Sequence, residues 1–139
     1  MSPTGFEENR RLLESVFASL AAGDSAPFVD AMADEFRWHF AGRWSWALDW
    51  GSGRDETRQR LLGPLMEQFA EYRLQAQEVI ADGERVVVRA VAEARTVRGD
   101  DYPQAYCYVF TVRDGRLIDV LEYCDTALVE RVLELPGSR

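Results

Sequence analysis

Alternation of polar and apolar residues over most of the second half of the chain constrains the fold more than any other feature. Four segments alternate in this way: 72–81, 85–98, 102–113 and 116–124. The pairs Asp82-Gly83, Gly99-Asp100 and Asp114-Gly115 separate them. An Asp-Gly pair between alternating segments is a strong signal for a β-hairpin, because these residues tolerate the positive φ of a tight turn. The sequence therefore predicts four strands joined as an antiparallel meander.

The first thirty residues have helical periodicity instead. Thr4 and Glu7 have the spacing of a capping box, and apolar residues then recur at helical intervals. Gly23 is expected to end this helix as a C-cap glycine. Asp24 or Ser25 is expected to cap a second, short helix.

The next segment predicts a strand followed by a loop rich in tryptophan. Residues 36–40 alternate, and the loop 41–54 contains Trp44, Trp46 and Trp50. Loop tryptophans can line the mouth of a pocket or form a lid, or they can close the open end of the core. We expect them at or near the mouth of a cavity.

Two more helices complete the predicted order. Asp55 opens one of them, and Gly63-Pro64 should break or kink it. Its inward residues are expected to be Leu61, Leu62, Leu65, Met66 and Phe69. Asp125 and Thr126 are expected to cap the last helix. Helices before a meander predict one α+β domain over residues 1–139, with a curved, mostly antiparallel sheet wrapped around N-terminal helices.

Charge and composition exclude several classes of partner. The chain has 139 residues, 47% of them hydrophobic, and a formal net charge of −8 with no basic cluster. Binding to nucleic acid or to anionic membranes needs concentrated positive charge, so neither is expected. Without a predicted signal segment or membrane span, a cytoplasmic location is expected. Cys107, Cys124 and His39 lack the spacing of a metal site.

Glu122 is the strongest candidate for an acid–base group. It shares a predicted strand face with Ile118, Val120 and Cys124. An ionised carboxylate in an apolar row is costly unless it is paired or protonated, and such groups have shifted pKa values. The alternative is a glutamate at a strand edge that faces water.

The strand at 85–98 allows two interpretations. One face carries small apolar residues and the other carries Arg89 and Glu93. The simpler interpretation buries the apolar face and exposes the charged one. The functional interpretation turns Arg89 and Glu93 into a pocket. Tyr106, Tyr108 and Gln104 share a face of the next strand, which suits a ligand pocket, a core or a dimer interface equally.

Several stretches resemble the ketosteroid isomerase/SnoaL-like superfamily. They are Ala22-Gly23-Asp24, residues 36–42, Gly53-Arg54-Asp55 and residues 109–125. The resemblance covers nearly the whole chain. It implies a cone of α+β structure around a deep apolar cavity, with no cofactor, and a homodimer, which we expect to form through the convex face of the sheet.

Within that superfamily the second half is most similar to limonene-1,2-epoxide hydrolase, which uses an aspartate–arginine–aspartate set. The resemblance places Glu122 on one aspartate and Arg89 on the arginine. The second aspartate falls on Val91, and Glu93 is the nearest carboxylate. The tyrosine and asparagine that hold the water fall on Trp38 and Phe40, which cannot replace them.

Two other activities of the superfamily fit differently. The catalytic base of ketosteroid isomerase falls on Phe40, so a true ketosteroid isomerase is not expected. The SnoaL-type polyketide cyclases use carboxylate and histidine acid–base residues, and Glu122, Glu93 and His39 leave that activity open. The resemblance also favours Arg89 inside the cavity, where it would form a buried or half-buried pair with Glu122.

The leading hypothesis is therefore an enzyme that acts on a small hydrophobic molecule by carboxylate acid–base chemistry, as an isomerase, a cyclase or an epoxide hydrolase. The expected catalytic residues are Glu122, Arg89 and Glu93. The expected substrate-binding residues are Trp38, Phe40, Trp46, Trp50, Gln104, Tyr106, Tyr108 and Cys124. No metal or cofactor is expected. The alternative is a domain that binds a small hydrophobic ligand without catalysis.

Overall fold

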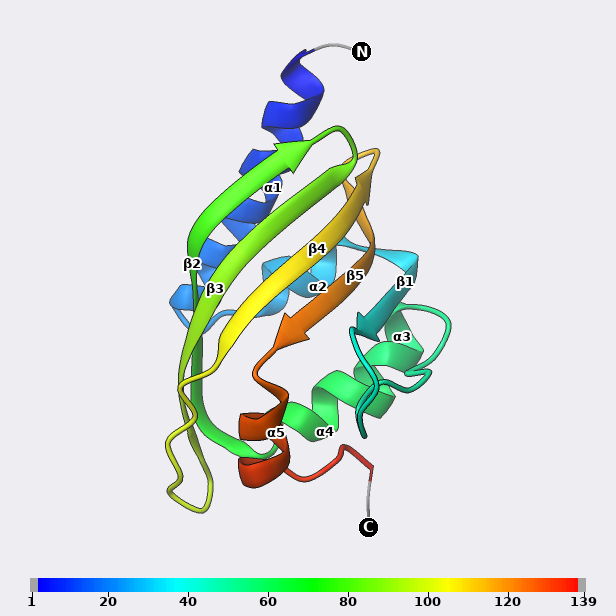
Figure 1. Ribbon diagram of the computed structural model, residues 1–139. Helices are drawn as coiled ribbons and strands as arrows, with labels where there is room; N and C mark the ends of the chain where they lie inside the picture. The colour runs from blue at the N-terminus through cyan, green and yellow to red at the C-terminus, as the bar shows by residue number, and fades with distance from the viewer. Residues whose placement is uncertain (1–2, 138–139) are drawn as a thin grey trace.

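A five-stranded sheet in the order β1-β5-β4-β3-β2 is the centre of the structure, a computed structural model that describes residues 3–137 (Figure 1). Its strands are β1 (Met32–Phe40), β2 (Phe69–Asp82), β3 (Arg85–Thr96), β4 (Ala105–Arg113) and β5 (Arg116–Cys124). Strands β2 to β5 pair antiparallel in sequence order, as the alternation predicted. Strand β1 pairs parallel with β5 at one edge.

The helices come before, between and after these strands in the predicted order. They are α1 (Pro3–Ala21), α2 (Ala26–Ala31), α3 (Arg54–Thr57), α4 (Gly63–Met66) and α5 (Thr126–Val132). Helix α1 is already formed at Pro3, so Thr4 lies inside it and the predicted capping box at Thr4 is wrong. Gly23 ends the first helical region at φ +84°, and its N–H donates to the Leu20 carbonyl. Asp125 caps α5 by accepting from the Leu128 N–H.

The Gly63-Pro64 pair widens its helix without ending it. A π-helical segment, η1 (Arg58–Leu62), joins α3 to α4, and the Gly63 N–H donates to the Arg58 carbonyl five residues earlier. Pro64 has no N–H, so the regular bonding pattern cannot continue through it. The helical segment 54–66 stays continuous. Its Leu61 is buried, but Met66 is exposed, and Phe69, predicted to be in this helix, belongs to β2.

The backbone geometry of one hairpin turn accounts directly for its Asp-Gly sequence. Asp114 and Gly115, between β4 and β5, have φ values of +53° and +73°. Positive φ at both central residues is the requirement of the tight turn whose twist matches the flanking strands. This turn joins β4 to β5, and a β-bulge between Val112 and Thr111 then shifts their pairing by one residue, so that Tyr108 lies opposite Glu122.

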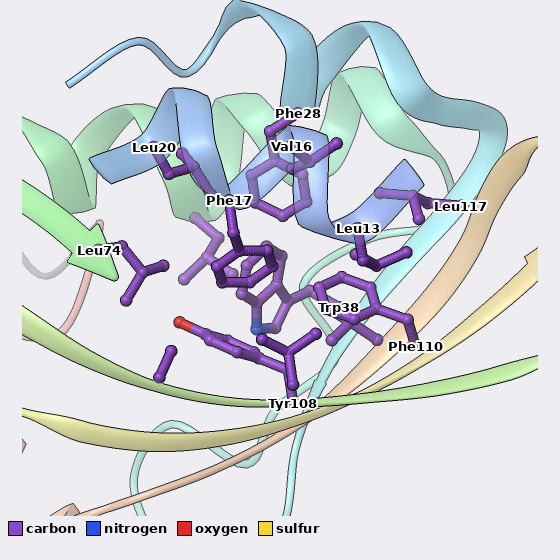
Figure 2. Close-up of a cluster of buried hydrophobic side chains, with 14 of the residues drawn as sticks. Leu13, Val16, Phe17, Leu20, Phe28, Trp38, Leu74, Tyr108, Phe110 and Leu117 are labelled. Atoms are coloured by element: carbon purple, nitrogen blue, oxygen red, sulfur yellow. The ribbon is translucent and has the colours of Figure 1, made fainter. Parts of the chain in front are cut away.

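The core lies between the helices and the inner face of the sheet. In Figure 2, Phe17 of α1 points toward Trp38, Tyr108 and Phe110 of the sheet. The ring centroids of Phe17 and Tyr108 are 5.8 Å apart, and those of Phe17 and Phe110 are 6.1 Å apart. Leu13, with 0% exposure, is part of the same cluster. Among the described residues, no helix combines the length and the apolarity that a membrane crossing requires.

Candidate functional site

A cavity of about 150 Å³ lies between the inner face of the sheet and the helices. Its walls come from all parts of the fold, and the lining residues are Phe17, Ser25, Phe28, Val29, Trp38, Phe40, Trp46, Leu61, Leu62, Leu65, Met66, Phe69, Tyr72, Leu74, Tyr102, Tyr106, Tyr108, Glu122, Val129 and Leu133. An apolar cavity of about 150 Å³ can hold a molecule the size of benzene. The size of the cavity therefore suits a ligand of about one ring.

Glu122 is the one carboxyl among the described residues that line this cavity. It lies on β5 directly between Phe40 of β1 and Tyr108 of β4 in the strand register. Its side chain is buried, with 7% exposure of the residue. The Trp38 Nε1–H donates to Glu122 Oε1 at 3.2 Å. The parallel pairing of β1 with β5 makes this contact possible, because it brings the inward face of β1 beside that of β5.

Burial dominates the protonation of Glu122. Desolvation raises the pKa of its carboxyl from 4.5 to about 8, while hydrogen bonds from Cys124 and Trp38 oppose the rise. The ionised form is disfavoured because the buried site replaces water with side chains that cannot solvate a charge. A carboxyl with a pKa near neutrality can both donate and accept a proton, as a general acid–base group must.

Four tyrosines bring hydroxyl groups into the same cavity. Tyr106 and Tyr108 lie on β4, with stacked rings whose centroids are 5.0 Å apart. Tyr72 of β2 and Tyr102, just before β4, face them. The hydroxyl oxygens of Tyr72 and Tyr106 are 2.6 Å apart and share a hydrogen bond. Burial raises the pKa of all four phenols above the ordinary value, so these hydroxyls stay protonated near neutral pH.

Gln104 supports the site from behind and does not line the cavity. Its side-chain N–H groups donate to the Tyr102 hydroxyl at 2.9 Å and to the Asp125 carbonyl at 3.0 Å. Its carbonyl oxygen accepts from the N–H groups of Ala105 and Asp125. All four of its strong hydrogen-bonding positions are therefore occupied, and it fixes Tyr102 and the start of α5.

The tryptophan loop closes the inner end of the cavity. Trp46 lines it, but Trp50 and Trp44 do not. Trp50 is 4% exposed, and its indole N–H donates to the Trp46 carbonyl. The Trp44 ring stacks on that of Trp46, with centroids 6.0 Å apart. The prediction placed all three at or near the cavity mouth, but of these three only Trp46 is a lining residue.

The most exposed lining residues mark the opening instead. Met66 is 42% exposed and Ser25 is also exposed, whereas Val29 and Leu62 are half-buried. These residues belong to α2, to the residue just before it and to the helical segment 54–66. The opening therefore lies between those two helical regions.

Arg89 and Glu93 lie on the opposite, outer face of the sheet. Arg89 Nε–H donates to Glu78 Oε1 at 2.8 Å, and the Arg89 side chain is 55% exposed. Glu93 is exposed. The inner face of β3 carries the small residues Val86, Val88, Ala90 and Ala92, all buried. The predicted pair of Glu122 with Arg89 is wrong, because strand alternation puts the two side chains on different faces.

The remaining predicted residues divide in the same way. Trp38, Phe40, Tyr106 and Tyr108 line the cavity with Glu122. Cys124 does not line it, although its thiol hydrogen-bonds the carboxyl of Glu122. His39 is exposed on the outer face, away from the cavity. Over the described part of the chain, no three His, Cys, Asp or Glu side chains are grouped to hold a metal ion.

Two polar members of the site were not predicted. Tyr72 lies two residues before the buried Leu74 on β2. Residues two apart on a strand share a face, so this spacing could have placed Tyr72 on the inner face. Tyr102 lies two residues before Gln104, on the face that was identified as a possible pocket wall. Neither residue gives a local signal that its hydroxyl meets others, because that contact depends on the pairing of distant strands.

Comparisons with known proteins agree on the fold. The model of the SnoaL-like domain family matches residues 13–120. An NTF2-like protein of unknown function from Burkholderia pseudomallei has a TM-score of 0.76 and 23% identity, covering 96% of this chain and 98% of that one. A protein assigned as a SnoaL-like polyketide cyclase from Jannaschia sp. CCS1 has a TM-score of 0.75 and 18% identity, covering 99% and 98%.

An LEH-like epoxide hydrolase from M. tuberculosis is similar to a comparable degree. Its TM-score is 0.70 at 20% identity, covering 92% of this chain and 90% of that one. No curated protein sequence matches this chain. At these identities the similarity to solved structures establishes the architecture alone.

Proposed function

The chain belongs to the SnoaL-like domain family, and from that premise we propose that it is a cofactor-free enzyme that transfers protons on a small hydrophobic molecule, with Glu122 as the acid–base group. Some proteins of this fold are named as a polyketide cyclase or an epoxide hydrolase, and others are of unknown function. The choice among these activities depends on the cavity of this chain.

The observation that supports the proposal most is a buried carboxyl in an aromatic cavity, with no basic side chain among the described residues that line it. With a pKa of about 8, roughly one Glu122 side chain in ten is ionised at pH 7. Both the acid and the base forms are therefore accessible during turnover. A positioned group of this kind contributes about 10²–10⁴-fold to a reaction rate.

The tyrosine hydroxyls would complement this group. Tyr72, Tyr102, Tyr106 and Tyr108 stay neutral near neutral pH and can donate hydrogen bonds. Donors that are already in place stabilise negative charge that develops on a substrate oxygen, as when a proton is removed beside a carbonyl. An isomerisation or a cyclisation needs this combination of one acid–base group and fixed donors.

Epoxide hydrolysis by an acid–arginine–acid set is the least supported of the three reactions. Arg89 and Glu93 would be its other members, but both lie on the outer face of the sheet. Glu122 alone would have to activate water and also protonate the epoxide oxygen. We therefore propose proton transfer of the isomerase or cyclase type.

Ligand binding without catalysis is the second candidate, and one observation favours it. Glu122 is the only carboxyl that lines the cavity among the described residues, and neither histidine nor arginine accompanies it. A site with one titratable group other than tyrosine can bind a ligand through hydrogen bonds without changing it.

The experiment uses 3-cyclohexen-1-one, a one-ring ketone that isomerises to a conjugated enone with strong ultraviolet absorbance. We expect the chain to accelerate this isomerisation and Glu122→Gln to lower the rate by about 10²-fold or more. Glu71→Gln, an exposed carboxyl on β2, is the matched control and should keep the parent rate. Equal rates for Glu122→Gln and the parent would overturn the proposal. Binding of the ketone with neither isomerisation nor deuterium exchange beside its carbonyl would favour the second candidate.

A further inference from the structure

The cavity holds a potential negative charge and no positive charge to balance it. Half of its twenty lining residues are aromatic, and Glu122 is the only acidic one among the residues that the structure describes. No arginine, lysine or histidine side chain lines it among the described residues. The nearest predicted cation, Arg89, is bound to Glu78 on the other face of the sheet. The proposed proton transfer does not by itself require this arrangement.

We propose that the cavity binds a small lipophilic amine as its ammonium ion, with the ammonium group directed at Glu122 and its hydrocarbon ring among the aromatic side chains. This inference rests on the site of the proposed function and names the class of ligand that the site takes. The ligand would be about one ring in size, because the cavity volume is about 150 Å³.

Charge balance is the first reason. A buried carboxylate without a partner is costly, and a cation that comes within hydrogen-bond distance removes much of that cost. An ammonium ion would bring the positive charge that the protein itself does not supply here. A ligand with a carboxylate would meet the same charge on Glu122 and would be disfavoured.

The aromatic walls are the second reason. Phe40 and Tyr108 are the residues opposite Glu122 on its two neighbouring strands. Trp38 donates its indole N–H to the carboxyl, so its ring lies next to the same group. The faces of aromatic rings attract cations, and the attraction is strongest where water is excluded. A cation at Glu122 would therefore meet rings contributed by both neighbouring strands, β1 and β4.

The distribution of charge in the whole chain is the third reason. The net charge is −8, and two arginines of the sheet pair with surface carboxylates, Arg89 with Glu78 and Arg113 with Glu84. A negatively charged surface raises the local concentration of cations and lowers that of anions. Access to the cavity is therefore easier for an ammonium ion than for an anion of equal size.

A neutral ligand that accepts a hydrogen bond is the competing class, and pH separates the two. A ketone only accepts and needs the protonated carboxyl of Glu122, so its binding weakens as pH rises through about 8. An alcohol can accept from the carboxyl or donate to the carboxylate, so its binding does not strengthen over this interval as that of a cation does. An ammonium ion needs the carboxylate, so its binding strengthens over the same interval. An alkylammonium remains charged there because its pKa is close to that of lysine, about 10.4.

Only Glu122 titrates between about pH 7 and pH 9 among the groups that face it. These groups are Trp38 from β1, Tyr72 from β2, Tyr102, Tyr106 and Tyr108 from β4 and the residues before it, and Cys124 from its own strand. Burial raises the pKa of the Cys124 thiol and of the four phenols, so they remain neutral. The pH dependence of binding therefore reports the carboxyl.

The test compares cyclohexylmethylamine with cyclohexylmethanol, which has nearly the same shape, by isothermal titration calorimetry of the full chain at pH 7 and pH 9. We expect the affinity for the amine to rise about tenfold between these values, because the ionised fraction of Glu122 rises from about 0.1 to about 0.9. The affinity for the alcohol should fall or stay level. Titration in two buffers of different ionisation enthalpy should show release of nearly one proton per amine bound at pH 7.

Two variants make the result specific to the site. Glu122→Gln should lose the preference for the amine and its pH dependence while it still binds the alcohol. Glu71→Gln should behave as the parent does. An alcohol that binds as tightly as the amine at pH 9, no binding of either compound, or amine binding that survives Glu122→Gln unchanged would overturn the inference.

This result is separable from the test of the proposed function. Amine binding through Glu122 without any isomerase activity would support the inference and favour a binding domain. Loss of isomerisation in Glu122→Gln without preference for the amine would support proton transfer and reject the amine as the ligand class.

Discussion

The two faces of the sheet place the same residue type in opposite environments. On the outer side, the carboxylate of Glu78 on β2 accepts a hydrogen bond from Arg89 Nε–H at 2.8 Å, and the Glu78 side chain is 48% exposed. On the inner side, Glu122 has an indole N–H and a thiol as partners but no cation, and burial raises its pKa to about 8. A glutamate in this sheet is a surface charge or an acid–base group according to the face on which alternation places it.

The largest expected effect is on stability as a function of pH. The pKa of Glu122 is about 8 in the folded protein and 4.5 as the ordinary value, so between these values the folded state holds a proton that the unfolded state has lost. Raising pH therefore favours unfolding over this interval, and the cost levels off above about pH 8. At about 1.4 kcal/mol per pKa unit, the difference is roughly 5 kcal/mol.

Glu122→Gln removes this titration while keeping the shape of the side chain. We expect the variant to match the parent in unfolding free energy at about pH 4 and to exceed it by several kcal/mol at about pH 9. Urea unfolding of both proteins at the two pH values measures the difference. If the parent loses no more unfolding free energy than the variant between these pH values, the carboxylate of Glu122 is solvated in the folded protein.

The next largest effect is the difference in stability lost when a side chain is truncated on the inner face and on the outer face. Phe110→Ala on the inner face should lower the unfolding free energy by about 3–5 kcal/mol, because this ring is fully buried among Phe17, Phe28 and Tyr108. Ile80→Ala, at an outer position that is 51% exposed, should cost less than about 1 kcal/mol. Similar losses in chemical denaturation would mean that the outer face is covered to the same extent.

A second copy of the chain could cover the outer face of the sheet, and this homodimer remains a proposal. Leu121, Val109, Val87 and Ile80 form a row across the outer face, in register over four strands, and the first three are half-buried. If two copies meet through this row, sedimentation at micromolar concentration should give the mass of two chains. Val109→Glu should then give one chain, whereas a parent that sediments as a single chain at all accessible concentrations would rule out this dimer.

The smallest expected effect concerns Arg89. Its exposed pair with Glu78 should contribute less than about 1 kcal/mol to stability. Arg89→Ala should also leave the pKa of Glu122 unchanged, because the two side chains lie on opposite faces. A clear rise in that pKa in the variant, followed by the pH dependence of unfolding, would restore the pair that the family resemblance implies.

The sequence predicts most of the fold and about half of the site, for reasons that particular residues make clear. Local signals were sufficient for the hairpin at Asp114-Gly115 and for the helix that ends at Gly23, because turn chemistry is a property of adjacent residues. Alternation alone placed Glu122 on an apolar face correctly. The simpler interpretation of β3, with Arg89 exposed, also followed from alternation.

The errors came from contacts between distant parts of the chain. The resemblance moved Arg89 into the cavity, although strand alternation kept it outside with Glu78. The hydrogen bond between Tyr72 and Tyr106 depends on how β2, β3 and β4 are paired and curved, which no local pattern specifies. The tryptophan loop was placed at the opening because loop residues are usually exposed, but its rings pack against Phe40 inside the core.

The central claim is that Glu122 is a buried carboxyl, mostly neutral at pH 7, in a cavity to which residues 3–137 contribute no cationic side chain. The most direct test is a pH titration of its side-chain carboxyl carbon by NMR, with ¹³C-labelled glutamate and Glu122→Gln to assign the signal. We predict a midpoint near pH 8 for this carboxyl. A midpoint at or below the ordinary value of 4.5 would mean that Glu122 is solvated or paired with a cation, and would contradict both the proposed function and the proposed ligand class.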